Sequence, residues 1–569
     1  MAGLTRQADS GVRGLMRPAG RHSGARCVAL CLAGTAATGA GLLLPAALGR
    51  ALDTLLADGS ATGWVLCCAG LVLLIAVLDA AETVLVGTVD ARTTAWLRRR
   101  VSGQVLALGP RAVTRFGSGE LVARVVGDAA QAGTAPGARA TLLAACAGPL
   151  GGVVALALID PWPAVVLLTG APVLALLLRA LARDTAECAA DYQRVQGRIA
   201  SALAEAVAGH RTVRAAGTAD RETARILRPL PELARAGHRM WRVQGRAAGQ
   251  AVAVAPLLQL GVVAVAGVLL ARHRLSVGEM LAAARYAVLA TGVGVLVGQL
   301  SGLVRARAAA ARLAQVQAQP APAYGTRPLP PGPGRLQLRG VTARLGTRTV
   351  LDGVDLDLPG GTTLAVVGRS GTGKSLLAAL AGRLADPDSG EILLDGVPLR
   401  DLTRTDLRRA VAHAFERPAL LGTTVVDTLA LGLPSPDPDR IREAARTAHA
   451  DDFVRRLPQG YATPCAEAPL SGGEAQRLGL ARAFAHGGRL LILDDALSSL
   501  DTVTEHHITR ALLARGRTTR LIVAHRATTA ARADAVAWLD GGRVRAVGRH
   551  EELWRDAEYR AVFGDGGRA

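Results

Sequence analysis

The sequence predicts a multidomain protein, in which an all-α transmembrane domain of six helices is followed by an α/β domain with a phosphate-binding loop. Three observations support this prediction. The chain has 569 residues, which is more than one ordinary hydrophobic core accommodates. Long apolar runs recur through residues 27–304. A glycine-rich loop at 368–375 then lies between an apolar strand and an apolar helix, which is the context that a phosphate-binding loop requires.

The first half of the chain contains six apolar runs, each close to the ~20 residues that a helix needs to cross a bilayer. They lie near 27–49, 63–88, 141–159, 164–182, 248–271 and 280–304. The connections 89–140 and 183–247 are long, rich in arginine and composed largely of helix-forming residues. Because arginine-rich connections stay in the cytoplasm, both long connections and both termini are predicted to be cytoplasmic. The short connection 272–279, with two arginines, departs mildly from this rule.

The composition favours a membrane protein over a nucleic-acid-binding protein. The net charge is +20, but the arginines lie between apolar runs, as the positive-inside bias predicts. Aromatic residues make up only 3% of the chain, so it offers little base-stacking surface and no nucleic-acid partner is expected. The bias toward Arg, Ala and Gly suggests a GC-rich bacterium and therefore a bacterial plasma membrane. The seven cysteines lack zinc-ligand spacing with His and are interpreted as reduced core residues.

The sequence divides into four parts. Residues 1–26 form a basic N-terminal segment, and the apolar run after it is too long for a cleavable signal. The transmembrane domain is predicted over 27–316. Residues 317–334 are dominated by Pro and Gly, which is typical of an extended, semi-rigid linker. The nucleotide-binding domain is predicted over 335–569.

Two carboxylates, Asp79 and Glu82, lie three residues apart in the second apolar run. Carboxylates inside a membrane span are costly and usually face a water-filled cavity. One interpretation is therefore a cavity wall that favours cationic or polar cargo. The alternative is that both residues lie near the inner interface, where they are solvated or paired with arginine.

The phosphate-binding loop comprises Gly368, Arg369, Ser370, Gly371, Thr372, Gly373, Lys374 and Ser375. Its glycines let backbone N–H groups approach phosphates, and the following helix adds its positive dipole end. Lys374 is predicted to reach the β- and γ-phosphates of ATP, and the Ser375 hydroxyl to bind Mg²⁺. Lys374 is also the only lysine in the chain, which indicates a position where a compact point charge is needed.

Three further segments carry groups suited to ATP chemistry. The apolar run 490–493 ends in Asp494, predicted to hold Mg²⁺, and Asp495, which could deprotonate the attacking water. A second anion site is predicted where a helix begins at Ser471, Gly472, Gly473 and Glu474. Another buried strand, 521–524, ends at His525, which could contact the γ-phosphate. Two phosphate-binding surfaces in one domain suggest that two copies meet around the nucleotide.

Together these motifs resemble those of ATP-binding-cassette (ABC) transporters of the type IV exporter fold. The arrangement is that of a half-transporter, with one transmembrane domain fused to one α/β phosphate-loop ATPase domain. The resemblance covers about residues 15–565, and its most specific part is the order and spacing of the phosphate loop, Leu470–Glu474 and the Asp494 strand. It implies that Leu470–Glu474 is the signature motif, which contacts ATP held by the opposite subunit.

The resemblance extends to other positions. It implies that Ser498–Asp501 is the D-loop and that His525 is the switch histidine. Glu467 lies near the position of the family's coupling glutamate, although the spacing is about two residues short. Phe116–Asp128 and Glu205–Arg214 resemble the two cytoplasmic connections of exporters, which carry the coupling helices.

Three positions depart from the family pattern. Leu345 falls where an aromatic residue normally stacks on adenine, and Glu416 falls where the family has the Q-loop glutamine. Asp495 replaces the catalytic glutamate after Asp494, which sets the carboxylate back by on the order of 1 Å, and such a displacement can cost about 10²-fold in rate. Asp495, His525 and Glu416 are the candidate catalytic residues of a site that binds ATP and turns it over slowly.

An intact signature beside an altered phosphate-loop site favours a heterodimer. The signature would complete the partner's hydrolytic site, while this chain's own loop would form a degenerate site. The alternative is a slow homodimer in which Asp495 is an adequate base.

Three functions fit these features. The first is an ATP-driven exporter of a small molecule, lipid or peptide-like compound. The second is an importer built on the exporter fold, with siderophore-like cargo, because the sequence does not fix the direction of transport. The third is an ATP-gated membrane regulator with little turnover, although the intact signature and His525 argue against it.

Overall fold

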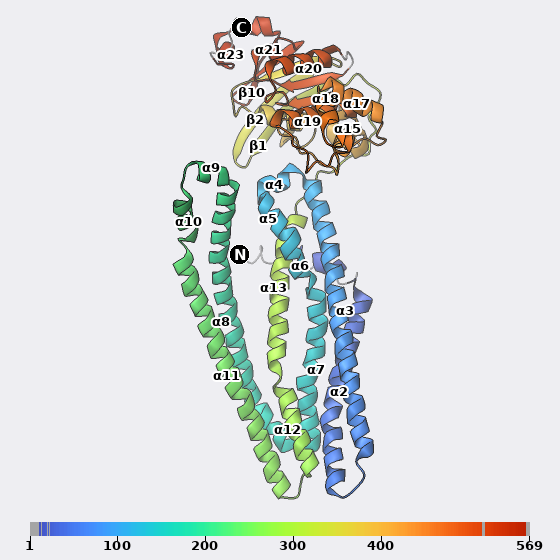
Figure 1. Cartoon of the computed structure of the whole chain (residues 1–569), viewed down its shortest axis with the longest axis vertical. Helices are drawn as coiled ribbons and strands as arrows, with labels where there is room; N and C mark the ends of the chain where they lie inside the picture. The colour runs from blue at the N-terminus through green and yellow to red at the C-terminus, as the bar shows by residue number, and fades with distance from the viewer. Residues whose placement is uncertain (1–10, 13, 20, 22, 515–517, 565–569) are drawn as a thin grey trace. The chain divides into compact units, whose positions relative to one another are not determined.

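A computed structural model describes residues 11–564, except residues 13, 20, 22 and 515–517. The chain divides into two compact units, whose elements are labelled in Figure 1. The first unit runs to Leu106 and resumes over Arg115–Pro320. The second comprises Ala107–Thr114 and the residues from Ala321 onward.

Long helices form the first unit, and each predicted apolar run lies in one or two of them. They are α2 (Gly24–Leu56), α3 (Thr62–Leu108), α7 (Ala135–Ile159), α8 (Pro161–Ala208), α11 (Leu230–Ala271), α12 (Val277–Thr291) and α13 (Val293–Gln317). Helix α8 packs along α11, and α2 packs along α7 and α12 (Figure 1). Among the described residues, Gly24–Leu56, Thr62–Leu108 and Ser118–Ile159 are long and apolar enough to cross a membrane. Pro161–Gly170 and Pro256–Ala271 are shorter apolar segments.

The last predicted span, 280–304, is not one helix. It is interrupted at Gly292, where α12 ends, and α13 begins at the next residue. Glycine is a poor helix former, and the Thr291 hydroxyl before it donates to the carbonyl of Ala287 at 2.8 Å. Thr291 also accepts a hydrogen bond from Gln259 of α11 at 2.8 Å. The interruption is therefore held by polar contacts that apolar periodicity does not reveal.

The arginine that departs from the positive-inside pattern has an acidic partner. Asp160 caps the start of α8 by accepting from the backbone N–H of Trp162 at 3.0 Å. Its second oxygen accepts from Arg274 Nη2 at 2.8 Å. This ion pair joins the two short connections 159–163 and 272–279 and offsets the positive charge of one of them.

Both long connections are helical, as their composition predicted. The first contains the end of α3, α4 (Pro110–Phe116), α5 (Ser118–Ala123), the π-helix η1 (Arg124–Asp128) and α6 (Ala129–Gly133). The second contains the end of α8, α9 (His210–Ala215) and α10 (Ala219–Leu227).

A buried polar network ties the first connection to α13. Arg124 donates to the carbonyl of Arg312 at 2.6 Å and to Gln315 at 3.1 Å. Asp128 accepts from Arg312 Nε at 2.8 Å. Both Arg124 and Asp128 are buried. A π-helical turn often marks a functional position, and here it places both side chains on the same helix.

The two membrane carboxylates have different surroundings. Asp79 is exposed, whereas Glu82 is half-buried beside Gly34 of α2, where an added Cβ would lie 3.3 Å from Glu82 Oε2. Within the described part of the chain, neither carboxylate forms an ion pair with an arginine. The pairing with arginine that the sequence allowed is therefore not seen among the described residues.

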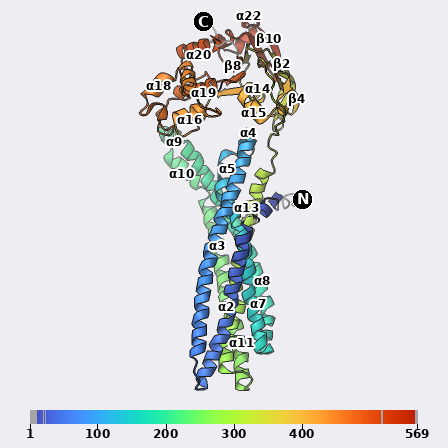
Figure 2. The ribbon, with the colours of Figure 1, turned by 90° about the vertical axis from the view of Figure 1, so that its right-hand side faces the viewer.

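The second unit contains two sheets and their covering helices (Figure 2). The smaller sheet has the order β2-β1-β4-β5 and the larger has the order β10-β9-β3-β8-β7-β6. The strands are β1 (Leu336–Leu345), β2 (Arg348–Leu358), β3 (Thr363–Val367), β4 (Ser389–Leu394), β5 (Val397–Pro398), β6 (Val411–Phe415), β7 (Leu490–Asp494), β8 (Thr519–Val523), β9 (Ala535–Asp540) and β10 (Arg543–Gly548). The α-helices are α14 (Lys374–Ala381), α15 (Arg404–Ala410), α16 (Val425–Ala430), α17 (Pro438–Thr447), α18 (Asp451–Arg456), α19 (Gly472–His486), α20 (Thr502–Ala514), α21 (Ala527–Ala530), α22 (His550–Leu553) and α23 (Ala557–Ala561).

Strands β9, β3, β8, β7 and β6 are parallel to one another, and β10 is antiparallel to β9. All five residues of β3 and of β8 are buried, as expected for parallel strands covered on both faces. Because the carboxyl ends of parallel strands meet at one edge, the loops after β3, β6, β7 and β8 gather there. This edge places the predicted catalytic and phosphate-binding residues near one another.

The Pro- and Gly-rich segment after α13 is extended but is not a free spacer. Tyr324 is partly buried against the core of the second unit. The Arg383 guanidinium lies 4.7 Å from the centre of its ring, and Arg408 donates to its hydroxyl at 3.2 Å. The segment is therefore fastened to the nucleotide-binding unit by its aromatic residue.

Acidification is expected to destabilise the second unit. Burial, with Arg408 nearby, lowers the pKa of His413 in β6 from its ordinary 6.5 to about 4. The unfolded chain therefore binds a proton at a pH where the folded chain does not, so stability is lost as the pH falls from 6.5 toward 4. Thermal unfolding of the full chain across this interval should show a weaker pH dependence for His413→Gln than for wild type. An unchanged pH dependence would assign acid lability to other groups.

Candidate nucleotide site

The phosphate loop connects β3 to α14, as the sequence predicted. Gly371 and Gly373 adopt positive φ angles of 84° and 99°, which side chains with a Cβ rarely tolerate. Gly373 precedes the first residue of α14, and a Cβ there would lie 2.8 Å from Leu351 Cδ2. The glycines therefore permit both the turn and its close packing, and the helix N-terminus is left to face an anion.

Lys374 is folded onto the loop. Its ammonium group donates to the carbonyls of Gly368 at 2.8 Å and Arg369 at 3.0 Å, and the residue is 6% exposed. Burial lowers the pKa of Lys374, while Asp495 and Asp494 oppose that shift. The ammonium group therefore lies inside the loop where a phosphate would be held.

Ser375 and Asp494 fit a divalent cation. Asp494 Oδ1 is buried and has no hydrogen-bond partner among the described residues, although Ser375 hydrogen-bonds to this side chain. Burial raises the pKa of Asp494, and Glu416 adds to the shift. A hydroxyl and a carboxylate are hard oxygen donors of the kind that Mg²⁺ uses together with water and phosphate oxygens. The described part of the chain contains no cluster of three or more His, Cys, Asp or Glu side chains suited to a metal.

Asp495 lies beside His525 at the ends of neighbouring strands. Asp495 Oδ2 is 3.8 Å from His525 Nε2. The backbone of Asp495 has φ +52°, a left-handed conformation that Asp tolerates better than most residues. Burial raises the pKa of Asp495, with His525 opposing that shift. A carboxylate with a raised pKa is a better proton acceptor, which suits a general base.

Glu416 and Leu345, the other two departures from the family pattern, contribute different properties to this site. Glu416 follows β6, and its side chain is 53% exposed but close enough to raise the pKa values of Asp494 and Asp495. It therefore adds negative charge where a glutamine would add none. Leu345 ends β1 and is 57% exposed, so it offers an aliphatic surface and no aromatic ring.

The predicted second anion site is the first turn of α19. Ser471 Oγ accepts from the backbone N–H of Glu474 at 3.3 Å, and Glu474 Oε2 accepts from the backbone N–H of Ser471 at 2.8 Å. This reciprocal arrangement is a capping box, and these hydrogen bonds lower the pKa of Glu474. Ser471 and Gly472 are exposed, so the turn is accessible to a nucleotide held by another chain.

Comparison with known proteins matches both halves of the chain. The family model described as "ABC transporter" matches residues 351–498, and that described as "ABC transporter transmembrane region" matches residues 28–292. The ABC transporter ATP-binding protein RamA of Streptomyces coelicolor is 52% identical over 541 residues, which is 95% of this chain and 85% of RamA. The chain belongs to the ABC transporter family.

Two further comparisons bear on the fold and the relatives of this ABC transporter. The ATP-dependent lipid A-core flippase of Escherichia coli K12 is 30% identical over 512 residues, covering 87% of this chain and 86% of the flippase. The structure of a bacterial Atm1-family ABC exporter with ATP bound superposes with a TM-score of 0.85, covering 97% of this chain and 99% of the exporter. At 23% identity this second likeness establishes the exporter fold alone.

As an ABC transporter with one transmembrane domain and one ATPase domain, the chain binds ATP and couples its hydrolysis to transport. It is a multi-pass membrane protein, and the half-transporter arrangement requires dimerisation. The sequence had predicted an ATP-driven transporter subunit and a multi-pass membrane protein, and both predictions are confirmed.

Sequence reasoning missed one residue at this site. Gln476 lies in α19, is 1% exposed, and donates hydrogen bonds to the backbone carbonyls of Glu416 and Asp495. The only available signal was its place two residues after the signature turn. Glu467, which the family resemblance had singled out, is exposed. It lies in a turn in which its backbone N–H donates to the carbonyl of Pro464 at 3.0 Å.

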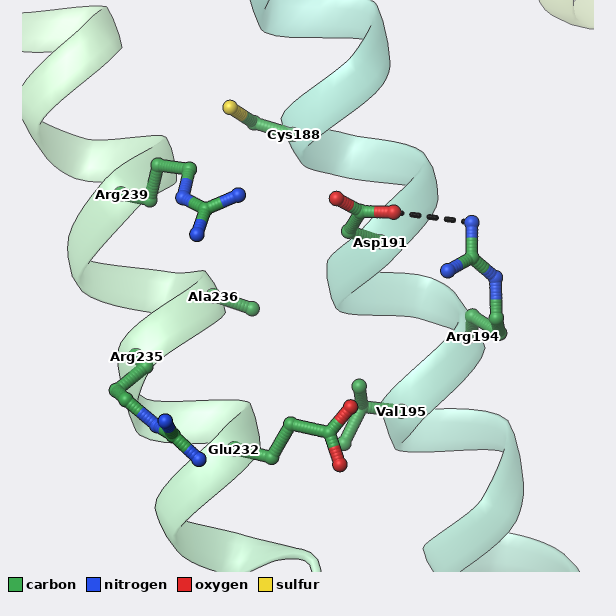
Figure 3. A pocket seen from close by; sticks show the side chains of 8 residues that line it. All are labelled: Cys188, Asp191, Arg194, Val195, Glu232, Arg235, Ala236 and Arg239. Carbon is green, nitrogen blue, oxygen red and sulfur yellow. Dashed lines mark ion pairs between the residues drawn. The ribbon is translucent and has the colours of Figure 1, made fainter.

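The transmembrane unit of this ABC transporter contains a polar cavity of about 350 Å³ between α8 and α11 (Figure 3). Its lining consists of Cys188, Asp191, Arg194, Val195, Glu232, Arg235, Ala236 and Arg239. Asp191 pairs with Arg194 at 2.9 Å, and Glu232 pairs with Arg198 across the two helices. The lining therefore contains both carboxylates and arginines.

Proposed function

We propose that this chain is one subunit of a heterodimeric ABC exporter in a bacterial plasma membrane, with the ATPase domain in the cytoplasm. The observation that carries the proposal is an asymmetry within the chain. The signature turn has a complete capping box, whereas the chain's own phosphate loop is accompanied by Asp495, Glu416 and Leu345. The signature completes the partner's hydrolytic site, and this chain's loop mainly holds ATP.

At this chain's own site, the phosphate-loop N–H groups and Lys374 hold the phosphates of ATP. Ser375 and Asp494 hold Mg²⁺, which neutralises charge on the phosphate oxygens when bound. Asp495 accepts a proton from the attacking water, and His525 holds that carboxylate and the γ-phosphate in place. Hydrolysis at this site is slow because the Asp495 carboxylate is one methylene short.

We further propose that the cargo is a lipid or a hydrophobic small molecule. The Escherichia coli relative is described as a lipid A-core flippase. The transmembrane helices of this chain expose many aliphatic side chains, for example Leu32, Leu66 and Leu143, while aromatic residues are sparse. An aliphatic surface suits acyl chains better than it suits stacked aromatic compounds.

The experiment that tests the heterodimer is purification of the tagged chain from its native membranes, followed by mass spectrometry and an ATPase assay in lipid nanodiscs. The expected result is a second half-transporter at equal stoichiometry, with Glu after its Asp at the position of Asp494. A complex of this chain alone that hydrolyses ATP at a normal rate would overturn the proposal, because Asp495 would then serve as an adequate base at two equivalent sites.

A further inference from the structure

Gln476 is a buried amide whose polar atoms all have partners. Its Nε2 donates to the carbonyl oxygens of Glu416 and Asp495, each at 3.3 Å, and its Oε1 accepts from the backbone N–H of Ser499 at 3.1 Å. These residues belong to two loops at the carboxyl edge of the sheet: Glu416 follows β6, and Asp495 and Ser499 lie in the loop between β7 and α20. One side chain therefore fixes the spacing of the Glu416 loop, the base Asp495 and the D-loop.

The rest of this helix face does not explain an amide at this position. The next buried residues of α19, Leu478 and Leu480, belong to an apolar cluster. A buried amide is costly unless it is hydrogen-bonded, and Gln476 is 1% exposed. Its three partners are backbone groups, so the contacts depend on where the loops lie and not on the side chains that they carry.

The signature turn itself also lies next to the D-loop. A Cβ on Gly473 would be in ordinary van der Waals contact with the carbonyl oxygen of Ser499, at 3.4 Å, so the turn lies beside the D-loop backbone. Gln476 is three residues further along the helix and binds the N–H of that same Ser499. A displacement of the signature turn is therefore transmitted to the D-loop and, through the Gln476 amide, to Asp495.

We propose that Gln476 is a positioning residue that couples the signature turn to the placement of Asp495. This inference rests on the proposed function, in which the signature serves the partner's ATP and Asp495 serves this chain's own. Asp495 has a left-handed backbone, and its carbonyl is held by Gln476 Nε2 and by Ser498 Oγ at 3.0 Å. Loss of the amide frees Asp495 to move toward a relaxed backbone, which displaces its carboxylate from His525.

The test compares variants of the full transporter, assembled with its partner subunit in lipid nanodiscs. Gln476→Met keeps the length of the side chain and removes all three hydrogen bonds. Single-turnover hydrolysis at this chain's site is expected to slow by about 10- to 100-fold, because a displacement of about 1 Å costs on that order. The KM for ATP is expected to change by less than about threefold, because Lys374 and the phosphate loop are untouched.

Leu480→Met is the matched control, because Leu480 is fully buried in the same helix and its side chain forms no hydrogen bond with either loop. An equal rate loss in Leu480→Met, or no loss in Gln476→Met, would overturn the inference. Gln476→Glu keeps the acceptor for Ser499 but loses both donors, so it is expected to lose most of the rate as well.

The coupling is tested by a double-mutant cycle with Ser471→Ala. If Gln476 transmits the position of the signature turn, the double variant loses less than the product of the two single losses. Losses that multiply would overturn the coupling. Lys374→Ala is run in parallel: if it leaves hydrolysis unchanged, the proposed ATP site is wrong, whereas a silent Gln476→Met beside an inactive Lys374→Ala refutes this inference alone.

Discussion

Replacing Lys374 with Ala is expected to abolish ATP binding at this chain's own phosphate loop. The ammonium group is buried within the loop, where it donates to the carbonyls of Gly368 and Arg369 at 2.8 and 3.0 Å. A bound phosphate takes over those donors, and hydrogen bonds to charged groups contribute about 1.5–3 kcal/mol each. Loss of two such bonds raises the Kd for ATP by at least about 100-fold.

The measurement is labelling of the full-length chain in nanodiscs with a photoreactive ATP analogue, followed by mapping of the labelled peptide. Lys374→Arg is the matched control, because it keeps the positive charge but replaces a compact ammonium with a longer, planar guanidinium. We expect Lys374→Arg to retain weak labelling and Lys374→Ala to retain none at this loop. Undiminished labelling in Lys374→Ala would contradict the assignment of the whole site.

Replacing Asp495 with Glu is expected to raise ATP turnover at this site, because it restores the roughly 1 Å that one methylene spans, and better placement of the base alone is worth about 10- to 100-fold. The backbone opposes this gain. Asp495 has φ +52°, and holding a longer side chain in the left-handed region costs about 1 kcal/mol, or about fivefold. The gain in base placement exceeds that cost, so the net change is an increase.

Single-turnover hydrolysis by the purified transporter measures this effect, with Asp495→Asn as the control. Asn has nearly the same shape as Asp and tolerates the left-handed backbone, but it accepts no proton, so its turnover should fall below that of wild type. If Asp495→Glu leaves turnover unchanged, the slow step is assigned to Glu416, Leu345 or the partner's signature instead of the base.

Much of the fold and most of the site were predictable because their signals are local. The phosphate loop has a fixed spacing between a strand and a helix, and β3 and α14 lie where that spacing placed them. The signature turn was readable because Ser471 and Glu474 form a capping box within four residues. The apolar runs predicted membrane-spanning helices because about 20 consecutive apolar residues are enough for a helix to cross a bilayer.

The sequence by itself therefore determined the two-part architecture, the family and the positions of the candidate ATP-binding motifs. Tertiary structure alone decided the break at Gly292, the network that joins Arg124 and Asp128 to α13, and the hydrogen bonds of Gln476. Each of these depends on contacts between residues far apart in the chain: Gln476 lies 60 residues from Glu416, and Arg124 lies 188 from Arg312. A local pattern records which groups a segment offers, but only packing decides which distant backbone groups come within hydrogen-bonding distance of them.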